Sequence, residues 1–170
     1  QVIALSLIAA DQVTVTATID PTLTVVLSST SAALGTLSTS QVAQAGITST
    51  VTTNAAGGYV SLVKYSGIMS NGVQDLADTT GGTIVAGQAE FGVSTSKSSQ
   101  TISTWSPTAC STTGTTSTAS ALTTSFQSFA SAGSAASSDA TTLCFLASTT
   151  ATQAPGSYST TATLVTTAKF

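Results

Sequence analysis

Histidine and arginine are absent from this chain, and charged residues of every kind are scarce. Only 5% of the residues are charged, whereas an ordinary soluble domain has about 25%. Without histidine the chain lacks the commonest general base, proton shuttle and metal ligand. Three lysines against six carboxylates give a net charge of −3, so a basic patch for nucleic acid cannot be assembled. We therefore predict a protein that is not an enzyme, has no catalytic, cofactor or metal site, and does not bind nucleic acid.

What the chain does contain is small, β-branched and hydroxyl-bearing side chains. Its 170 residues, 41% of them hydrophobic, are enough for one domain with a proper core but too few for two. Disordered chains are charged and poor in β-branched residues, which is the opposite of this composition. The composition predicts a Thr-rich structural domain, with residues 12–170 as its single folded unit.

Two cysteines, Cys110 and Cys144, lie far apart in the sequence. An even count, without a C-x-x-C spacing and without histidine, favours one disulfide over a zinc or redox site. The alternative is a pair of reduced, buried thiols in a cytosolic protein. The predicted bridge closes a loop of about 35 residues and is worth roughly 3.5 to 4 kcal/mol by the chain-entropy estimate.

The N-terminal segment has the most informative pattern. Residues 2–10 (VIALSLIAA) are apolar on both alternating faces, but the run is too short to cross a bilayer as a helix, so no membrane span is predicted. Apolar and threonine side chains then alternate through residues 13–19, which predicts a half-buried strand. The first half needs burial on both faces, and the terminal strand of a free monomer rarely obtains it. We therefore expect another molecule to cover this segment.

Further short strands follow, separated by turns that contain glycine, proline or asparagine. Such punctuation between β-branched and aromatic runs is typical of a sandwich, a jelly roll or an open barrel. We predict an all-β fold, specifically an antiparallel β-sandwich of jelly-roll or immunoglobulin-like type with an N-terminal extension. The expected strands after residue 20 are 23–27, 47–53, 59–65, 83–85, 90–94, 143–146 and 158–167.

Residues 111–142 are built almost entirely from Ser, Thr, Ala and Gly. This low-complexity composition is typical of a solvent-facing loop, and its position between the cysteines predicts a long loop stapled at its base. Its hydroxyls are candidate acceptors for O-linked sugar. N-linked sugar is excluded, because neither Asn54 nor Asn71 is followed two positions later by Ser or Thr.

Two weak patterns for chemistry also have purely structural interpretations. The S-x-x-K spacing of some serine acyl-transfer enzymes occurs at 61–64 and 94–97. Those enzymes need both side chains on one helical face, but positions i and i+3 of a strand face opposite ways, so we expect no Ser–Lys pair. Three oxygen-bearing side chains could hold calcium, but without EF-hand spacing a solvated turn is favoured. They are Asn71, Asp75 and Asp78.

Three stretches of the sequence resemble secreted β-sandwich subunits. They are QVTVTATIDPTLTVVLSST followed by LGTLST near the start, TTNAAGGYVSLV at 52–63, and the closing APGSYSTTATLVTTAKF. The nearest family is the spore coat protein U type pilins, whose domains begin on an alternating strand and end on a P-a-G-x-Y strand. Camelysin-like biofilm fibre subunits and Thr-rich bacterial surface proteins share parts of the pattern. The resemblance covers residues 12–65 and 144–170, but this chain lacks the cysteine that the pilins usually have after their first strand.

The resemblance implies assembly by donor-strand complementation, in which an N-terminal extension of one subunit fills a groove in the next. It implies a structural subunit of an extracellular filament or pilus, a head-to-tail homopolymer whose donor strand is residues 1–11. The face of that strand expected to enter the neighbour is the larger one, which has no hydroxyl: Ile3, Leu5, Leu7 and Ala9.

The alternative function is a monomeric secreted module that binds a surface or a carbohydrate through its loops. In either case, because the chain starts at Gln1 rather than methionine, we expect an extracellular product whose signal peptide has been removed.

Overall fold

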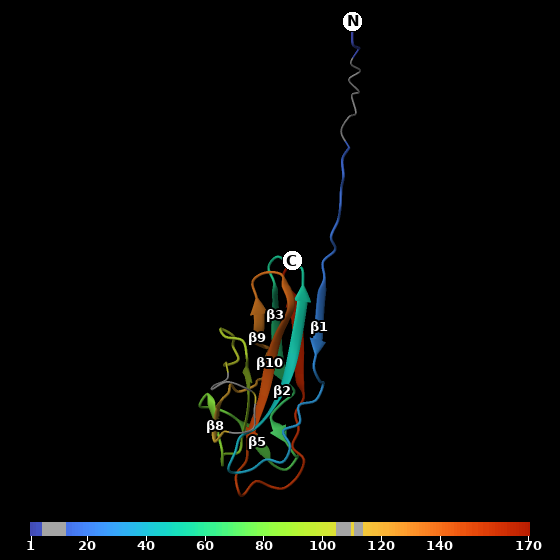
Figure 1. Ribbon diagram of the computed structural model, residues 1–170. Coiled ribbons are helices and arrows are strands. Elements are labelled where there is room, and N and C mark those ends of the chain that lie inside the picture. Colours follow the sequence, from blue (N-terminus) through green and yellow to red (C-terminus); the bar gives the residue numbers. More distant parts are fainter. Residues whose placement is uncertain (5–12, 105–109, 111–113) are drawn as a thin grey trace.

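The computed structural model describes residues 1–4, 13–104, 110 and 114–170. This part of the chain forms strands and no helix, so the fold is all-β as predicted (Figure 1). The strands are β1 (Leu23–Leu27), β2 (Ala43–Thr53), β3 (Tyr59–Tyr65), β4 (Met69–Ser70), β5 (Asp75–Asp78), β6 (Thr83–Val85), β7 (Glu90–Thr95), β8 (Thr116–Thr118), β9 (Gln127–Ala132), β10 (Ala136–Ser148) and β11 (Ala162–Ala168).

Most strands belong to two sheets. The larger has the order β1-β2-β10-β7-β5-β4 and the smaller the order β11-β3-β9, while β6 and β8 form a separate two-stranded ribbon. Neighbouring strands are antiparallel except β5 and β7, which run parallel. The prediction of a purely antiparallel fold is therefore wrong at this pair. The chain leaves β5 and passes through β6 before it enters β7, and such a crossover is what a parallel pair requires.

The two sheets pack face to face around a shared core. Side chains of β3 alternate between buried and half-buried from Tyr59 to Tyr65, because successive residues of a strand point to opposite faces. The buried set packs against the inward side chains of the larger sheet, among them Val51, Phe91 and Phe145. This layered arrangement fits the expected β-sandwich, and we call the two packed sheets the body.

A second, smaller core lies on the outer face of β10. Leu146 and Cys144 pack there against Ile84 of β6 and Ala119, which follows β8. The β6–β8 ribbon thus covers this face, and β10 is buried on both faces from Leu143 onward. The predicted disulfide is present at this place and joins Cys144 to Cys110, with the two Cα atoms 5.6 Å apart.

The Ser/Thr/Ala/Gly-rich tract at 111–142 was expected to be one long loop, and that prediction is wrong. β8, β9 and the first part of β10 lie within it. A ladder of backbone hydrogen bonds needs no large side chains, and threonine is itself a good strand former. The few large residues of the tract supply the anchorage, since Leu122 and Phe129 are fully buried in the main core.

Residues 1–22, which we call the arm, precede β1. Residues 13–22 lead away from the body (Figure 1), belong to no strand and are exposed. The prediction of a half-buried strand at 13–19 is therefore wrong for the isolated chain: Val13, Val15 and Ile19 are each at least 85% exposed. The alternating pattern is there, but no strand of the body lies beside these residues to cover them.

The turn between β2 and β3 gathers several parts of the chain at one end of the body. Gly58 has a φ of +72°, and a Cβ atom there would lie 2.1 Å from the carbonyl oxygen of Ala132, so only glycine fits. The backbone of Gly57 and Gly58 exchanges hydrogen bonds of 2.9 and 2.8 Å with Lys169, just after β11. β1 begins and β11 ends beside this turn, and we call this the arm end of the body (Figure 1).

Candidate functional site: an apolar seam between two edge strands

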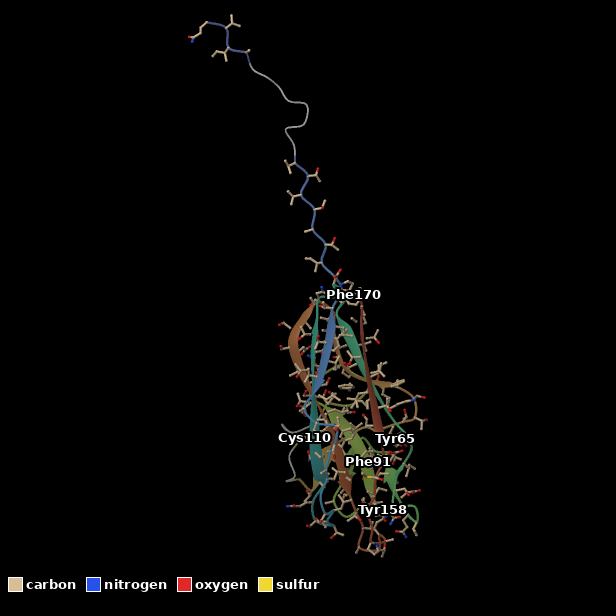
Figure 2. All side chains as sticks on the ribbon, turned by 90° about the vertical axis from the view of Figure 1, so that its right-hand side faces the viewer. Tyr65, Phe91, Cys110, Tyr158 and Phe170 are labelled. Carbon is tan, nitrogen blue, oxygen red and sulfur yellow. A yellow bond between two sulfur atoms is a disulfide. The ribbon has the colours of Figure 1, made fainter. Side chains whose placement is uncertain are left out.

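One side of the body is open. β1 is an edge strand of the larger sheet and β11 of the smaller, and both lie on the side that faces the viewer in Figure 2. Within the described ranges, no strand pairs with the outer edge of either one. The backbone N–H and C=O groups along these edges can therefore accept another strand. We call this side of the body the seam.

The inward side chains of β1 are only partly covered. Leu23, Val25 and Leu27 pair with Thr53, Val51 and Ser49 of β2, and side chains that face each other across an antiparallel pair share one face of the sheet. Their β2 partners are at most 3% exposed, whereas the three β1 side chains remain 37–41% exposed. The pattern of β1 is thus that of a core strand whose cover is missing.

β11 shows the same feature on the other wall of the seam. Its inward residues pair with four buried residues of β3, yet they are themselves only half-buried. They are Ala162, Leu164, Thr166 and Ala168. Three of these side chains are small, so this wall leaves room beside the core.

A cavity of about 510 Å³ opens into the seam at the end away from the arm. Its apolar floor and walls come from both sheets, and no charged side chain stands among the described residues that line it. Figure 2 shows two of its aromatic residues, Phe91 and Tyr158, below Phe170 at the arm end. The other large apolar residues around it are Leu27, Leu34, Ile47, Met69, Phe145 and Leu164.

The cavity continues under the segment that follows β1. A second hollow of about 760 Å³ shares Ala32, Leu34, Met69 and Tyr158 with the first. The hydroxyl of Tyr158 donates to the carbonyl oxygen of Ala154 at 2.8 Å, so it is engaged within the chain. What the seam offers a partner is therefore apolar surface, serine and threonine residues along the cavity, and strand edges.

The partly buried carboxylates are engaged elsewhere. Asp139 accepts hydrogen bonds from the Lys97 ammonium at 2.5 and 2.7 Å and from the Tyr59 hydroxyl at 2.8 Å. Burial alone would raise the pKa of Asp139, but the bonds from Lys97 and Tyr59 outweigh it and hold the pKa below its usual value. Burial, together with the bond to Asp139, raises the pKa of Tyr59 to about 12.

A second tyrosine–carboxylate pair joins β3 to β5. The Tyr65 hydroxyl donates to Asp78, and Oδ1 of that carboxylate is buried with no partner in the described part of the chain. Burial raises the pKa of Asp78, and the bond from Tyr65 offsets this only in part. Burial and the carboxylate raise the pKa of Tyr65 to about 12. Both tyrosines are thus held neutral as hydrogen-bond donors over the ordinary pH range.

The serine and the lysine of each S-x-x-K sequence have different surroundings in the fold. In β3, Ser61 faces inward and bonds Thr166 at 2.8 Å, while the ammonium of Lys64 lies 4.9 Å from the ring centre of Phe126. Ser94 is buried in β7, whereas Lys97 pairs with Asp139. Both S-x-x-K sequences therefore lie in or beside strands and not on a helix.

Two of the three candidate calcium ligands, Asn71 and Asp78, are bound to separate partners. Asn71 Oδ1 accepts the backbone N–H groups of Val73 and Gln74 at 2.9 and 2.8 Å, and Asp78 bonds Tyr65. No group of three or more His, Cys, Asp or Glu side chains placed to hold a metal ion occurs among the described residues. The described residues likewise include no helix long and apolar enough to span a membrane.

Of the residues predicted to enter a neighbouring subunit, only Ile3 is among those the structure describes, and it is 85% exposed. Leu5, Leu7 and Ala9 lie outside the described residues, so their role stays a prediction. No protein-family model matches the chain, and no curated protein matches it significantly. The resemblance to spore coat protein U type pilins likewise stays a prediction.

Sequence reasoning did not identify the residues of the seam. It expected 23–27 and 158–167 as strands but gave neither an edge position. In β11, the sequence feature that marks a seam strand is an inward set in which only Leu164 is large. In β1, it is the pair of neighbouring valines, Val25 and Val26, which point to opposite faces. A strand that is apolar on both faces but remains exposed is recognisable only once its neighbours are known.

Proposed function

We propose that this protein is a structural subunit of an extracellular filament, in which the arm of one copy fills the seam of the next. The observation that carries the proposal is that one chain has both an open apolar seam and an exposed apolar arm that leads away from it. An open strand edge beside apolar pockets is the binding site for an added β-strand. In this proposal the body is a β-sandwich and the arm is its donor strand.

The exposed apolar surface is concentrated where the proposal needs it. Single exposed apolar residues are normal on a soluble protein, but a contiguous group marks an interaction site. Most of the large exposed apolar side chains belong to the arm or to β1: Val2, Ile3, Val13, Val15, Ile19, Leu23, Val25, Val26 and Leu27. The sequence of the arm also contains the apolar residues Leu5, Leu7 and Ala9, which lie outside the described residues.

The direction of the inserted strand follows from the fold. β1 runs away from the arm end and β11 runs toward it. Copies joined head to tail along the arm all point the same way, so the arm enters the next body at the end opposite to its arm end. Residue 1 then lies deepest, and the arm runs antiparallel to β11. Antiparallel pairing is the more stable kind, so β11 is the edge that the arm extends.

The arm is long enough for this connection. Fully extended, its 22 residues span roughly 70 Å, whereas β10, the longest strand with 13 residues, spans roughly 43 Å. Residues 1–11, roughly 36 Å long when extended, can therefore lie along all 7 residues of β11 while residues 12–22 bridge the two bodies.

The inward positions of the two strands match in number. Four odd-numbered arm residues face the seam, and four residues of β11 face inward, so bulky arm side chains meet mostly small ones. We propose the register Ile3 opposite Ala168, Leu5 opposite Thr166, Leu7 opposite Leu164, and Ala9 opposite Ala162.

Burial of the donor side chains supplies the driving force. If about 600–800 Å² of apolar surface leaves water, the gain is roughly 15–20 kcal/mol before the costs of association and ordering are subtracted. Even after a large discount the joint is tight. Because each copy contributes a different surface to each of its two joints, the contact is heterologous and repeats into an open polymer.

The first experiment compares the two faces of the arm. Leu5→Asp or Leu7→Asp would bury an unpaired charge in the seam, a penalty of several kcal/mol, and should abolish filaments seen by electron microscopy. Ser6→Asp, on the opposite face, should assemble. Filaments that survive both leucine changes but not Ser6→Asp would show that the other face is inserted, since a shift of one residue exchanges the two faces.

The second experiment tests the seam with two neighbouring residues of β11. Leu164 faces inward and lines the cavity, whereas Val165 faces outward and is 41% exposed. Leu164→Asp should give monomers and Val165→Asp should give filaments, with circular dichroism to confirm that both fold. Folded Leu164→Asp protein that still assembles would exclude the seam as the acceptor.

An extracellular location and O-linked sugar are part of the proposal. The Cys110–Cys144 bridge is of the kind that persists in oxidising compartments. Exposed hydroxyls such as those of Ser137 and Ser138 in the hydroxyl-rich tract are candidate sugar acceptors. Intact-mass measurement of the native protein tests both points, since free thiols or an unmodified mass would contradict them separately.

The second candidate function is a monomeric module that binds a surface or a carbohydrate. The cavity of about 510 Å³ favours it, because small-molecule sites have volumes of about 300–1,000 Å³. This alternative predicts a stable monomer of the full chain at all concentrations. Size-exclusion chromatography of the full chain therefore separates the two proposals.

A further inference from the structure

The arm leaves the body through a side-chain clamp. Asn54, in the turn after β2, donates from Nδ2 to the carbonyl oxygen of Asp20 at 2.8 Å. Its Oδ1 accepts the backbone N–H of Thr22, also at 2.8 Å. One amide group therefore bonds the arm on both sides of Pro21. Since the side chain of Asn54 is exposed, these bonds are not a requirement of the core.

Two further features stiffen the same point. The hydroxyl of Thr53 donates to the carbonyl oxygen of Thr22 at 2.7 Å. Pro21 fixes its own φ and restricts Asp20 to extended conformations. The chain is therefore held straight where it passes from the arm into β1, and residues 13–22 point away from the body (Figure 1).

The seam could be filled by the chain's own arm or by the arm of another copy, and a straight exit favours the second. The seam begins at Leu23, directly beside the exit, so an arm that reversed at residues 20–22 would lie along its own body. Val13, Val15, Ala17 and Ile19 alternate with threonines and would then face inward. Such a self-inserted arm would run antiparallel to β1 and parallel to β11, which is the opposite of its direction in the neighbouring copy.

Self-insertion is the competitor that any filament of this kind must exclude. A segment tethered by a short linker meets its own body at an effective concentration on the order of millimolar, whereas a second copy is available only at its actual concentration. A subunit with a freely jointed arm would therefore cap its own seam and remain a monomer.

We propose that Asn54, acting with Pro21, is a positioning residue that directs the arm into a second copy of the chain by preventing its reversal. The inference rests on the proposed function, and it adds the choice of partner: another copy rather than the same one. Asn54 touches neither the seam nor the inserted part of the arm, so its effect is on the distribution between monomer and polymer.

The test compares two asparagines with similar local bonding. Asn54→Ala removes two hydrogen bonds between a side chain and the backbone. Asn71→Ala removes two such bonds in the β4–β5 turn, which does not touch the arm. At equal protein concentration, sedimentation velocity should show the monomer-to-polymer ratio of Asn54→Ala rise by about tenfold, as expected for the loss of one or two net hydrogen bonds. Asn71→Ala should match the unaltered chain.

Paired cysteines identify where the arm lies. Ile3→Cys with Ala168→Cys reports insertion into a neighbour and should give a covalent ladder of oligomers on mild oxidation. Val13→Cys with Ala162→Cys reports self-insertion and should give a bridged monomer. Adding Asn54→Ala should weaken the ladder and strengthen the bridged monomer, a change that mere loss of stability would not produce.

The outcomes separate the inference from the proposed function. If the unaltered chain forms no polymer, the proposed function fails. If it polymerises and Asn54→Ala behaves as Asn71→Ala, with no bridged monomer, the inference alone fails. If Asn54→Ala does not fold, Pro21→Gly tests the same inference through an exposed residue of the arm. An unchanged monomer-to-polymer ratio in the Pro21→Gly variant would overturn the inference.

Discussion

β1 and β3 are both short apolar strands, yet β3 lies in the core and β1 lies at the surface. β3 has a strand on each side, and its inward residues Tyr59 and Val63 are fully buried. β1 has a neighbour on one side only, and its inward Val25 stays 41% exposed. The two strands differ in the number of their neighbouring strands. Apolar residues at an unpaired edge are therefore better understood as half of an interface than as a badly built core.

The largest effect should come from a direct comparison of the seam with the opposite side of the body, which holds β9 and which we call the closed side. Phe129→Ala empties a fully buried position and should lower the free energy of unfolding by about 3–5 kcal/mol. Leu27→Ala, at a side chain already 37% exposed, should cost the monomer only about 1 kcal/mol. Urea denaturation of the arm-deleted monomer measures both. Equal costs would mean that the seam is as well packed as the closed side.

The next effect concerns the disulfide on the outer face of β10. Removing the Cys110–Cys144 bridge should cost about 3–4 kcal/mol, because its closed loop restricts the unfolded chain. Cys144 packs in the small core on the outer face of β10, whereas the neighbouring Phe145 lines the cavity of the seam on the other face. The Cys110→Ala/Cys144→Ala variant should therefore still assemble under conditions in which it is folded. Loss of assembly by a folded variant would show that the two sides are coupled.

The sequence predicts some elements of this fold and not others. The strand and turn patterns of the sequence located β1, β3 and β6 at the residues observed, and the cysteine count indicated the disulfide. They could not show the parallel β5–β7 pair, because pairing depends on contacts distant in sequence. They also missed the strands in 111–142, where small side chains make no hydrophobic pattern. The seam was not predictable, since an edge strand is defined by an absent neighbour.

The third effect uses pH to break the contacts of Tyr59 and Tyr65 with their carboxylates. Tyr59 and Tyr65 have pKa values of about 12 in the native protein and about 10 in the unfolded chain. The unfolded state therefore loses these protons first, and stability should fall as pH rises from about 10 to about 12. Each tyrosine should contribute about 1–2 kcal/mol after allowance for solvent screening. Tyr59→Phe and Tyr65→Phe should each flatten the alkaline decline, and a flat decline in the unaltered protein would contradict the assignment.

The smallest effect is expected at the Lys97–Asp139 ion pair, whose side chains are 30% and 24% exposed. Lys97→Ala should cost less than about 1 kcal/mol. The lowered pKa of Asp139 means that its contribution is present above about pH 4 and is lost on further acidification. Lys97→Ala should therefore weaken the acid dependence of the urea midpoint. If Lys97→Ala lowered the free energy of unfolding by more than Leu27→Ala does, this surface ion pair would contribute more than a side chain of the seam.

The antiparallel β1–β2 ladder also determines how the molecule bears mechanical load. The arm continues into the first residue of β1 along the direction of that strand. Tension on the arm therefore pulls β1 lengthwise past β2, and the five cross-strand pairs from Leu23–Thr53 to Leu27–Ser49 resist together in shear. A pull at right angles to the strand would instead peel those pairs apart one after another. A fibre built from such subunits would carry force along its axis in the geometry in which short strands are strongest.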